Sequence, residues 1–334
     1  MSFKICMIGC GEHSFNYHGP SCKKYARLND DVILAACCDI DEAKAAYYQK
    51  TFGFINRYSD YSKMLQKEEP DAVCLVVPVE CTAEIAYNIL DMGYPLILEK
   101  PPGRTPDEAK KLTEIARRKN IPNRVALNRR YMPLVFKMKE LLPENTTPED
   151  LFFIDCCMLR EKRTDPDFST TAIHAIDLVK YIAGADYRSV SFNYRELGFI
   201  GEGVVNTYMN CTFTSGAAGQ IRICPVAGTN IERFIVSFRD NTILLNLPLW
   251  SKLDTDGRIT HLRDNQILLD KSGHEISGSD EDNINIGVYY ENASFFDDIR
   301  AGRKPEGGID TAIQSVEIAN CIRNRASSYE NKLN

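Results

Sequence analysis

A lysine in this chain stands where an amine could take a proton from a substrate. Lys100 follows the apolar run Pro95–Glu99 and precedes Pro101. Because a residue before proline is kept out of the helical region, the backbone at Lys100 is expected to be extended and its ammonium group directed. A positively charged group beside it would favour the neutral amine, which is the form that acts as a general base. The alternative is a surface lysine in a proline-rich turn.

A histidine is the second candidate for proton transfer. His174 lies in the segment 170–184, which opens with hydroxyl residues and ends at a glycine, as a helix would. Thr170 lies four residues before His174 and Asp177 three residues after it, so the three side chains would share a helix face. Imidazole titrates near neutrality and suits proton exchange with a hydroxyl substrate. The alternative is a core histidine, and Asp177 could either fix its tautomer or face solvent.

The first fifteen residues carry the pattern of a phosphate-binding turn. The run Phe3–Ile8 indicates a buried strand, and G-x-G-x-x-S follows it. Gly9 permits the tight turn, Gly11 lets a phosphate approach bare backbone, and Ser14 occupies a third position that has to be small. The amides of the turn would face a pyrophosphate at the positive end of the next helix. Alone, such a pattern also occurs in ordinary loops.

A second strand supplies an acidic residue that strengthens this prediction. Val32–Cys38 indicates another buried strand, and Asp39 follows it, where a carboxylate could accept hydrogen bonds from both hydroxyls of an adenosine ribose. The same charge would repel a ribose phosphate, so NAD is favoured over NADP. The alternative role for Asp39 is to cap the helix that starts at Asp41. Because proline is tolerated in a first helical turn, Gly19-Pro20 indicates an irregular entry to the first helix.

Strands and helices alternate through the first part of the chain. Glycines at 53 and 93 end two of the helices, and Thr105-Pro-Asp-Glu108 has the form of a capping box. This order predicts an α/β fold, with a doubly wound parallel sheet whose ligands bind at the carboxyl ends of the strands. The expected elements are strands at 71–78 and 95–99 and helices at 41–51, 61–67, 81–92 and 105–119.

Beyond Pro122 the pattern changes to a run of strands. Turns at 214–216 and 240–241 are hairpin signals, so a second α+β domain with a large, mainly antiparallel open sheet is expected. A partner subunit is a plausible cover for a face of such a sheet. Ser277–Asn285 is polar and acidic and is expected to be a mobile loop. The expected elements are strands at 151–159, 190–196, 205–213, 220–226, 233–238 and 242–247 and helices at 287–301 and 311–325.

Composition excludes several classes of function. The 334 residues carry a net charge of −6 without a run of basic residues, which disfavours nucleic acid as a partner. No apolar stretch has the length of a membrane span and no leader pattern opens the chain, so a cytoplasmic location is expected. Most of the 12 cysteines lie in apolar strands and are expected to be reduced core residues. The five histidines are scattered and no Cys-x-x-Cys occurs, so no metal site is predicted.

The chain resembles the Gfo/Idh/MocA family of NAD(P)-dependent sugar oxidoreductases, named for glucose-fructose oxidoreductase, inositol dehydrogenase and rhizopine catabolism. The resemblance covers nearly the whole length. It implies an NAD-binding Rossmann domain at 1–121 and a substrate-binding and oligomerisation domain at 122–334, in a dimer or tetramer. The matching motifs are the Gly9 turn, Asp39, Val77-Pro78, Glu99-Lys100-Pro101, Asn128-Arg129-Arg130-Tyr131, His174-Ala-Ile-Asp177 and Phe295 to Gly302.

The resemblance also implies roles for individual residues. Lys100 and His174 would line the site where a hydroxyl carbon meets the nicotinamide. The implied cofactor contacts are Gly9, Gly11, Glu12, His13, Ser14, Asp39, Pro78, Glu99 and Lys100, and the implied substrate contacts are Lys100, Arg130, Tyr131, Arg160, Thr170 and His174.

The chain departs from the family at Thr170, where many relatives carry an aspartate. Threonine cannot act as a carboxylate base, so Lys100 is expected to carry more of the proton transfer. Asp165 or Asp167 could take the place of that aspartate. Arg160, Lys162 and Arg163 could bind an acidic sugar group, although a solvated loop is the simpler expectation. Trp250 could stack on a sugar or pack in a core or interface.

The leading functional hypothesis is an NAD-dependent dehydrogenase or reductase of sugars, cyclitols or sugar derivatives. A second hypothesis is redox-neutral chemistry through a transient keto sugar, as in a glycosidase, lyase or epimerase that recycles its NAD. A third is a non-catalytic protein that binds cofactor and sugar to regulate a partner. The sequence identifies neither the substrate nor the physiological direction.

Overall fold

The computed structural model describes residues 2–142, 150–249 and 253–332, which form two compact units. The first unit comprises Met1–Asn128 and Gly287–Val316, and the second comprises Arg129–Ile286 and Glu317–Asn334. The sequence prediction placed the boundary after residue 121. It differs because strand β6 pairs with β5 in the first sheet and because a distant segment, Gly287–Val316, returns to pack with the first unit.

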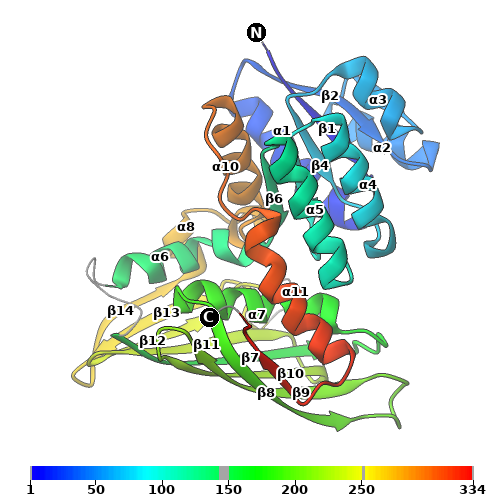
Figure 1. Ribbon diagram of the computed structural model, residues 1–334. Coiled ribbons are helices and arrows are strands. Elements are labelled where there is room, and N and C mark those ends of the chain that lie inside the picture. The colour runs from blue at the N-terminus through cyan, green and yellow to red at the C-terminus, as the bar shows by residue number, and fades with distance from the viewer. Residues whose placement is uncertain (1, 143–149, 250–252, 333–334) are drawn as a thin grey trace. The chain divides into compact units, whose positions relative to one another are not determined.

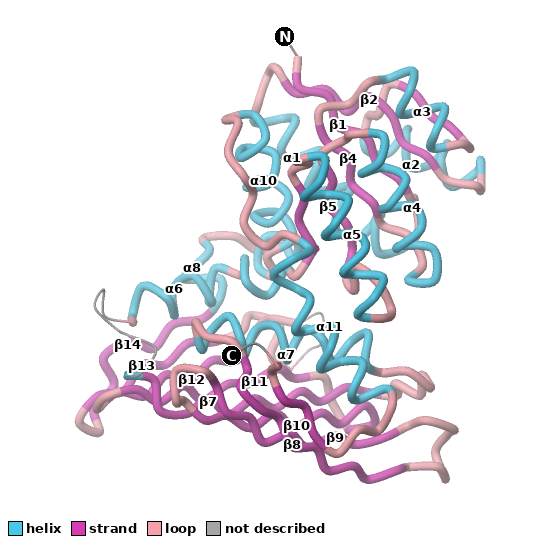
Figure 2. Tube along the Cα trace, in the orientation of Figure 1, coloured by secondary structure: helices cyan, strands magenta, loops and turns pink. Residues whose placement is uncertain are grey.

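The first unit is built on a six-stranded parallel sheet (Figures 1 and 2). The strand order is β3-β2-β1-β4-β5-β6, and every neighbouring pair is parallel, so the carboxyl ends of all six strands meet at one edge. This is the doubly wound order that reverses between β1 and β4. The strands are β1 (Phe3–Ile8), β2 (Val32–Cys38), β3 (Asn56–Tyr58), β4 (Ala72–Leu75), β5 (Leu96–Glu99) and β6 (Asn123–Ala126).

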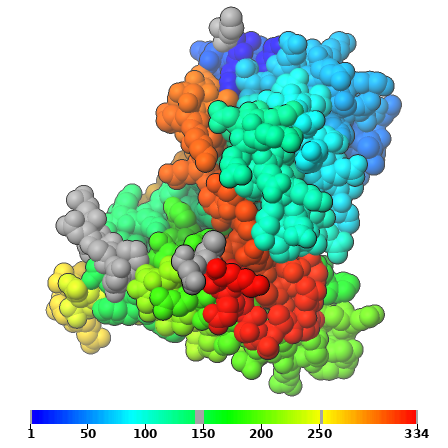
Figure 3. Space-filling model, in the orientation of Figure 1, coloured from blue at the N-terminus to red at the C-terminus, as the bar shows by residue number. Residues whose placement is uncertain are grey.

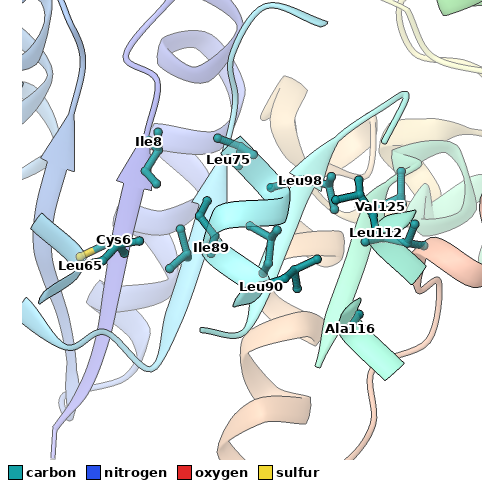
Figure 4. Packing of buried hydrophobic residues seen from close by; sticks show 14 of the residues in the cluster. Cys6, Ile8, Leu65, Leu75, Ile89, Leu90, Leu98, Leu112, Ala116 and Val125 are labelled. Carbon is teal, nitrogen blue, oxygen red and sulfur yellow. The ribbon is translucent and has the colours of Figure 1, made fainter. Parts of the chain in front are cut away.

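Helices cover both faces of this sheet. Successive side chains of β1 point alternately into the two cores that these helices form with the sheet. Cys6 and Ile8 pack with α3 (Tyr61–Glu68), α4 (Val79–Met92) and α5 (Pro106–Lys119), as Figure 4 shows. Ile5 and Met7 belong to the opposite core, which is rich in aromatic residues. The helices of that core are α1 (Gly19–Leu28), α2 (Glu42–Phe52) and α10 (Val288–Arg300).

The helix caps and helix ends that the sequence predicts are present in the structure. The Asp41 side chain caps α2, Thr105 and Glu108 form a capping box on α5, and Gly53 and Gly93 end their helices in the left-handed conformation. The irregular helix entry is also confirmed. A π-helical segment, η1 (Ser14–His18), leads into α1, whose first turn contains Pro20.

The second unit is built on a nine-stranded sheet in the order β14-β13-β12-β11-β7-β10-β9-β8-β15. All neighbouring pairs are antiparallel except β7 with β10, so the predicted, mainly antiparallel sheet is confirmed. The strands are β7 (Leu151–Glu161), β8 (Tyr187–Glu196), β9 (Val205–Phe213), β10 (Ala218–Ala227), β11 (Ile231–Phe238), β12 (Asn241–Asn246), β13 (Arg258–Arg263), β14 (Gln266–Ser272) and β15 (Ser328–Glu330).

The faces of this sheet differ. Helix α7 (Ser169–Ala183) packs on β7 and β10, and the Tyr187 hydroxyl donates to the carbonyl of Ile176 in that helix. The other face alternates outward and leaves Tyr208, Ile235 and Leu244 between 37% and 41% exposed. In Figure 3 the red end of the chain lies against green residues of the same unit, where β15 pairs with β8. The remaining elements are η2 (Asn128–Tyr131), α6 (Pro133–Leu141), α8 (Gly273–Ser277), α9 (Asp282–Asn285) and α11 (Ile309–Arg323).

Two sequence predictions need correction in the second unit. The expected loop Ser277–Asn285 contains the short helix α9, in which Asn283 and Asn285 are buried. Strands β13 and β14 were not predicted, and the largely exposed β14 has no alternation of polar and apolar side chains that would indicate it. Among the residues that the structure describes, none of the helices has the length and apolar character needed to cross a membrane.

Candidate functional site

The backbone of the turn after β1 lies directly against the backbone at the end of β4. Gly9 has a φ of +94°, and a Cβ atom there would lie 1.9 Å from the carbonyl oxygen of Val76. An L side chain therefore neither fits the space nor suits the conformation. The amide of Gly9 donates to the carbonyl of Cys38, and the amide of Val76 to that of Ile8. The first glycine of the motif is thus required by the fold itself.

In contrast to Gly9, the packing of the described residues does not require a glycine at position 11. A Cβ atom at Gly11 would meet no atom within 4 Å. The helix begins here, because the amide of Phe15 donates to the carbonyl of Gly11, and the amides that precede Phe15 are first-turn donors. Open space over a bare backbone with first-turn amides suits an anionic group such as a pyrophosphate.

Ser14 closes the motif through a contact that the sequence did not indicate. Its hydroxyl lies 2.9 Å from the hydroxyl of Tyr48 in α2, and both residues are completely buried. Glycine or alanine is the usual residue here, and the serine is accommodated because a buried tyrosine supplies its hydrogen bond. The pair joins the helix after the turn to α2.

Asp39 is oriented by two backbone amides. Its Oδ2 accepts from the amide of Cys10 at 2.8 Å, and its Oδ1 accepts from the amide of Asp41 at 2.9 Å. The helix cap of α2 is Asp41, not Asp39. The alternative role for Asp39 is therefore wrong. Each oxygen keeps a lone pair beside the Gly9 turn, so these residues fit an adenosine ribose with free hydroxyls.

The carboxylate of Glu99 is enclosed by two imidazoles. Its Oε1 lies 2.9 Å from His13 Nε2 and 2.9 Å from His18 Nε2, and its Oε2 accepts from the amide of Lys100. Burial would raise the pKa of Glu99, but the two histidines outweigh burial and hold this pKa well below its usual range. Two implied cofactor contacts, His13 and Glu99, thus meet each other, and His18 joins them unpredicted.

Lys100 stands at the carboxyl edge of the sheet, as expected. It directly follows β5 and is half-buried, and the Lys100–Pro101 peptide bond is cis. Pro78 lies at the same edge, at the start of α4, with its ring exposed. The first unit therefore gathers the predicted cofactor residues at the ends of β1, β2, β4 and β5.

His174 lies in the second unit, buried within α7. Its Nε2 is 3.2 Å from Nη1 of Arg129, which can only donate, so Nε2 accepts and a neutral ring carries its proton on Nδ1. Arg129 also pairs with Glu232, at 2.9 and 3.2 Å. Arg160 binds the same carboxylate and the carbonyl of Ile231. Burial would raise the pKa of Glu232, but the two arginines lower it to about 2.

Asp177, the other charged residue of the motif 174–177, pairs with a different arginine, Arg130. Asp177 is 1% exposed and accepts from Nε and Nη2 of Arg130, the first at 2.7 Å. The Arg130 guanidinium also lies over the ring of Tyr181, 5.4 Å from its centre. Asp177 therefore does not face solvent, and its carboxylate is held by Arg130. Arg130 and Tyr131 lie together in η2.

Thr170 and its acidic neighbours have local partners. The Thr170 hydroxyl lies 3.5 Å from the carbonyl of Asp167, at the start of α7. Asp167 accepts from the amide and hydroxyl of Ser169 and from Nε of Arg323, the last at 2.7 Å. Asp165 pairs with Arg163 at 2.7 Å. Both aspartates that could replace the family carboxylate are thus engaged elsewhere.

The prediction that Arg160 binds an acidic sugar group is not supported. Arg160 is 1% exposed at the end of β7 and binds Glu232, so it is neither in a solvated loop nor directed outward. Lys162 is exposed and pairs with Glu161. Trp250 lies outside the described residues. The buried partners of His174 were missed because the sequence places Arg129 and Glu232 103 residues apart.

The comparisons match the N-terminal part of the chain to a family. Residues 3–126 match the GFO_IDH_MocA family model, described as an oxidoreductase family with an NAD-binding Rossmann fold. A levoglucosan dehydrogenase of Pseudarthrobacter phenanthrenivorans is 29% identical over 156 residues, which cover 42% of this chain and 40% of that protein. A D-glucoside 3-dehydrogenase of Escherichia coli is 27% identical over 34% of this chain and 32% of its own length. The chain thus matches less than half of these relatives' length.

Solved structures share the fold over nearly the whole chain. A levoglucosan dehydrogenase in complex with NADH and L-sorbose has a TM-score of 0.80, with 19% identity, and the match covers 99% of both chains. An oxidoreductase domain protein from Kribbella flavida has a TM-score of 0.81 with 15% identity, again over 99% of both chains. At these identities the likeness concerns the fold.

The two glycines of the turn predict opposite effects of the same substitution. Gly9→Ala places a methyl group on the Val76 carbonyl and forces an unfavourable φ, so we expect strong destabilisation or loss of folding. Gly11→Ala meets open space and should leave the melting temperature within about 2 °C while weakening NAD binding. Thermal melting and cofactor titration measure both effects. A stable Gly9→Ala protein would contradict this account of the turn.

The Glu232 network predicts a stability change with pH. The folded-state pKa of Glu232, about 2, lies below the ordinary value of 4.5, so its stabilisation is complete above pH 4.5 and declines towards pH 2. Glu232→Gln leaves two buried arginines without their carboxylate and should cost about 3–5 kcal/mol at pH 7. The difference in the free energy of unfolding between Glu232→Gln and the natural chain should shrink towards pH 2. Denaturant unfolding at both pH values measures this.

Glu275 provides the matched control for this prediction. Its pKa is also lowered to about 2, mainly by the hydrogen bond from Lys271, but its carboxylate is exposed. Because solvent screens that pair, Glu275→Gln should have a much smaller effect. Equal losses in the two variants would contradict the role given to burial at Glu232.

Proposed function

We propose that the chain, whose residues 3–126 match the GFO_IDH_MocA oxidoreductase family, transfers hydride between NAD and a hydroxyl or keto carbon of a sugar, cyclitol or sugar derivative. The observation that carries this proposal is the edge of the first sheet. There, the turn with Gly9 and Gly11, the start of a helix and an oriented aspartate lie together, and Lys100 follows strand β5 of the same sheet.

The residues of the first unit would bind and orient the cofactor. The amides at the start of the helix would hold the pyrophosphate, and Asp39 would accept from the ribose hydroxyls. The backbone amides that fix the Asp39 carboxylate keep its charge at the position where NADP carries a phosphate, which favours NAD. The bound nicotinamide supplies the acceptor or donor of hydride.

Lys100 is proposed as the main proton-transfer group. It is half-buried and directly follows Glu99, whose carboxylate is fixed by two imidazoles and by the Lys100 amide. A rigid neighbour of this kind limits the positions that the lysine backbone can take, as general-base catalysis requires. In sugar oxidation, the neutral amine would accept the hydroxyl proton.

His174 is proposed as the second proton-handling group, with a restriction set by Arg129. An arginine stays protonated and keeps donating to Nε2, so this nitrogen cannot take a proton while the contact lasts. While this contact lasts, the neutral ring can only donate a hydrogen bond through Nδ1–H, so proton uptake by His174 would require the contact with Arg129 to open. Thr170, Arg130 and Tyr131 remain proposed substrate contacts, with Arg130 restrained by its pair with Asp177.

We further propose a cytoplasmic homodimer or homotetramer. All 12 cysteines are free and eight of them are buried, which suits a reducing compartment. The outward face of the second sheet supports assembly, because Ile235 and Leu244 are paired neighbours there and both remain exposed.

Replacing Lys100 tests the proposed chemistry. Lys100→Met should reduce kcat by at least about 100-fold, because the base is removed, while the dissociation constant of NAD changes little. Lys111→Met, on the exposed side of α5, is the matched control and should keep full activity. Steady-state kinetics with a sugar substrate and NAD titration provide the two readouts. A fully active Lys100→Met enzyme would refute the assignment.

A further inference from the structure

Three potential metal ligands converge in the first unit. The Nε2 atoms of His13 and His18 both lie 2.9 Å from Oε1 of Glu99, and the ligand atoms of the three residues all lie within 4.8 Å of one another. Two imidazoles and one carboxylate form the ligand set of several catalytic zinc sites. The sequence did not predict this group, because Glu99 is 81 residues away from His18.

The π-helical segment explains how two histidines five residues apart come together. In a regular α-helix, neighbours on one face are three or four residues apart. The segment η1 runs from Ser14 to His18, directly after His13, and a π turn joins residue i to residue i+5. His13 and His18 therefore stand on adjacent positions, with their ring centres 5.7 Å apart. Such π segments are frequent at functional sites.

Two of the three ligands are held in place by the protein. His18 is 2% exposed, and its Nδ1 lies 3.1 Å from the side-chain amide of Asn292. The Glu99 side chain is 13% exposed and accepts from the amide of Lys100 through its other oxygen. His13 is 53% exposed, which leaves the group open on one side. A buried pair with one accessible ligand can bind an ion from solution without unfolding.

We propose that His13, His18 and Glu99 form a binding site for a divalent transition-metal ion such as Zn²⁺, with a fourth position open to solvent. Imidazole nitrogen and carboxylate oxygen suit Zn²⁺ and its first-row neighbours better than Mg²⁺ or Ca²⁺. Tetrahedral ligands with bond lengths of 2.0–2.1 Å lie roughly 3.3 Å apart. The two contacts of 2.9 Å would thus widen by about 0.4 Å, which a half-exposed His13 allows.

Asn292 would support the ligand state of His18. It is completely buried, and its Oδ1 has no hydrogen-bond partner while its Nδ2 faces His18. A half-turn of the amide brings Oδ1 to His18 Nδ1, which then carries the ring proton and leaves the lone pair of Nε2 for the metal. The asparagine can therefore serve the metal-free and the metal-bound tautomer.

This inference goes beyond the proposed function and does not depend on it. The residues belong to one unit, and metal binding can be measured without NAD or a sugar. Failure of the dehydrogenase proposal would leave the metal site in place, and failure of the metal site would leave the hydride-transfer proposal unaffected.

The test is a titration of the full chain, freed of metal by chelation and dialysis, with ZnSO₄ in a calorimeter. We expect one Zn²⁺ per chain. His13→Gln should weaken the affinity by on the order of 100-fold or more, since loss of even a supporting residue costs about 10–100-fold. Asn292→Ala should weaken the Zn²⁺ affinity by about 10–100-fold, as the loss of a supporting residue does. Circular dichroism verifies that both variants are folded, and His13→Ala gives a second truncation of the exposed ligand.

His274 is the matched control, because it also lies near two carboxylates, at 3.5 Å from Asp256 and 3.2 Å from Asp280. His274→Gln should bind Zn²⁺ as the natural chain does. Titration with Co²⁺ identifies the ligands, since thiolates give an intense near-ultraviolet band that nitrogen and oxygen ligands lack. Absence of stoichiometric Zn²⁺ binding, unchanged affinity in both His13 variants, or a thiolate band would each overturn the proposal.

Discussion

A contact between two stretches of backbone sets the geometry of the first unit. The turn after β1 lies so close to the carbonyl of Val76 that only glycine fits at position 9. This approach aligns the end of β1 with the end of β4, and the turn then presents the amide of Cys10 to Asp39 at the end of β2. The proposed cofactor contacts therefore depend on the lack of a side chain at Gly9. Gly11 has free space around it, so the packing of the described residues does not require glycine there.

The sequence predicted those features that arise locally. The bounds of β1, β2 and β9, the capping box of α5 and the interrupted first helix all follow from neighbouring residues and are confirmed. Features that join distant segments were missed. The return of Gly287–Val316 to the first unit has no local signature, and neither has the Arg129–Glu232 pair. The roles of Lys100 and His174, first indicated by residue type and position and strengthened by the family resemblance, remain predictions.

The charges around His174 show how the second unit accommodates Thr170. Nη1 of Arg129 donates to Nε2 of the histidine, and Arg129 is held in turn by Glu232, whose carboxylate also accepts from Arg160. Buried ion pairs add little net stability over an apolar core, but removing one partner is costly, so such a network restrains its members. We infer that it orients the imidazole of His174, because Thr170 supplies no carboxylate for that purpose. The aspartates nearest to Thr170 are committed to Arg163 and Arg323 and do not take that place.

Nicotinamide absorbance tests most directly the proposed net transfer of hydride from a sugar or cyclitol to NAD. The purified protein is mixed with excess NAD and a panel of sugars, cyclitols, uronates and glycosides, and sugar consumption is followed in parallel. Reduced cofactor that accumulates in proportion to the sugar consumed is the predicted result. A sugar that changes chemically while reduced cofactor stays at or below the enzyme concentration would contradict the claim and favour redox-neutral chemistry. Binding of NAD and sugar without any conversion would favour a regulatory protein.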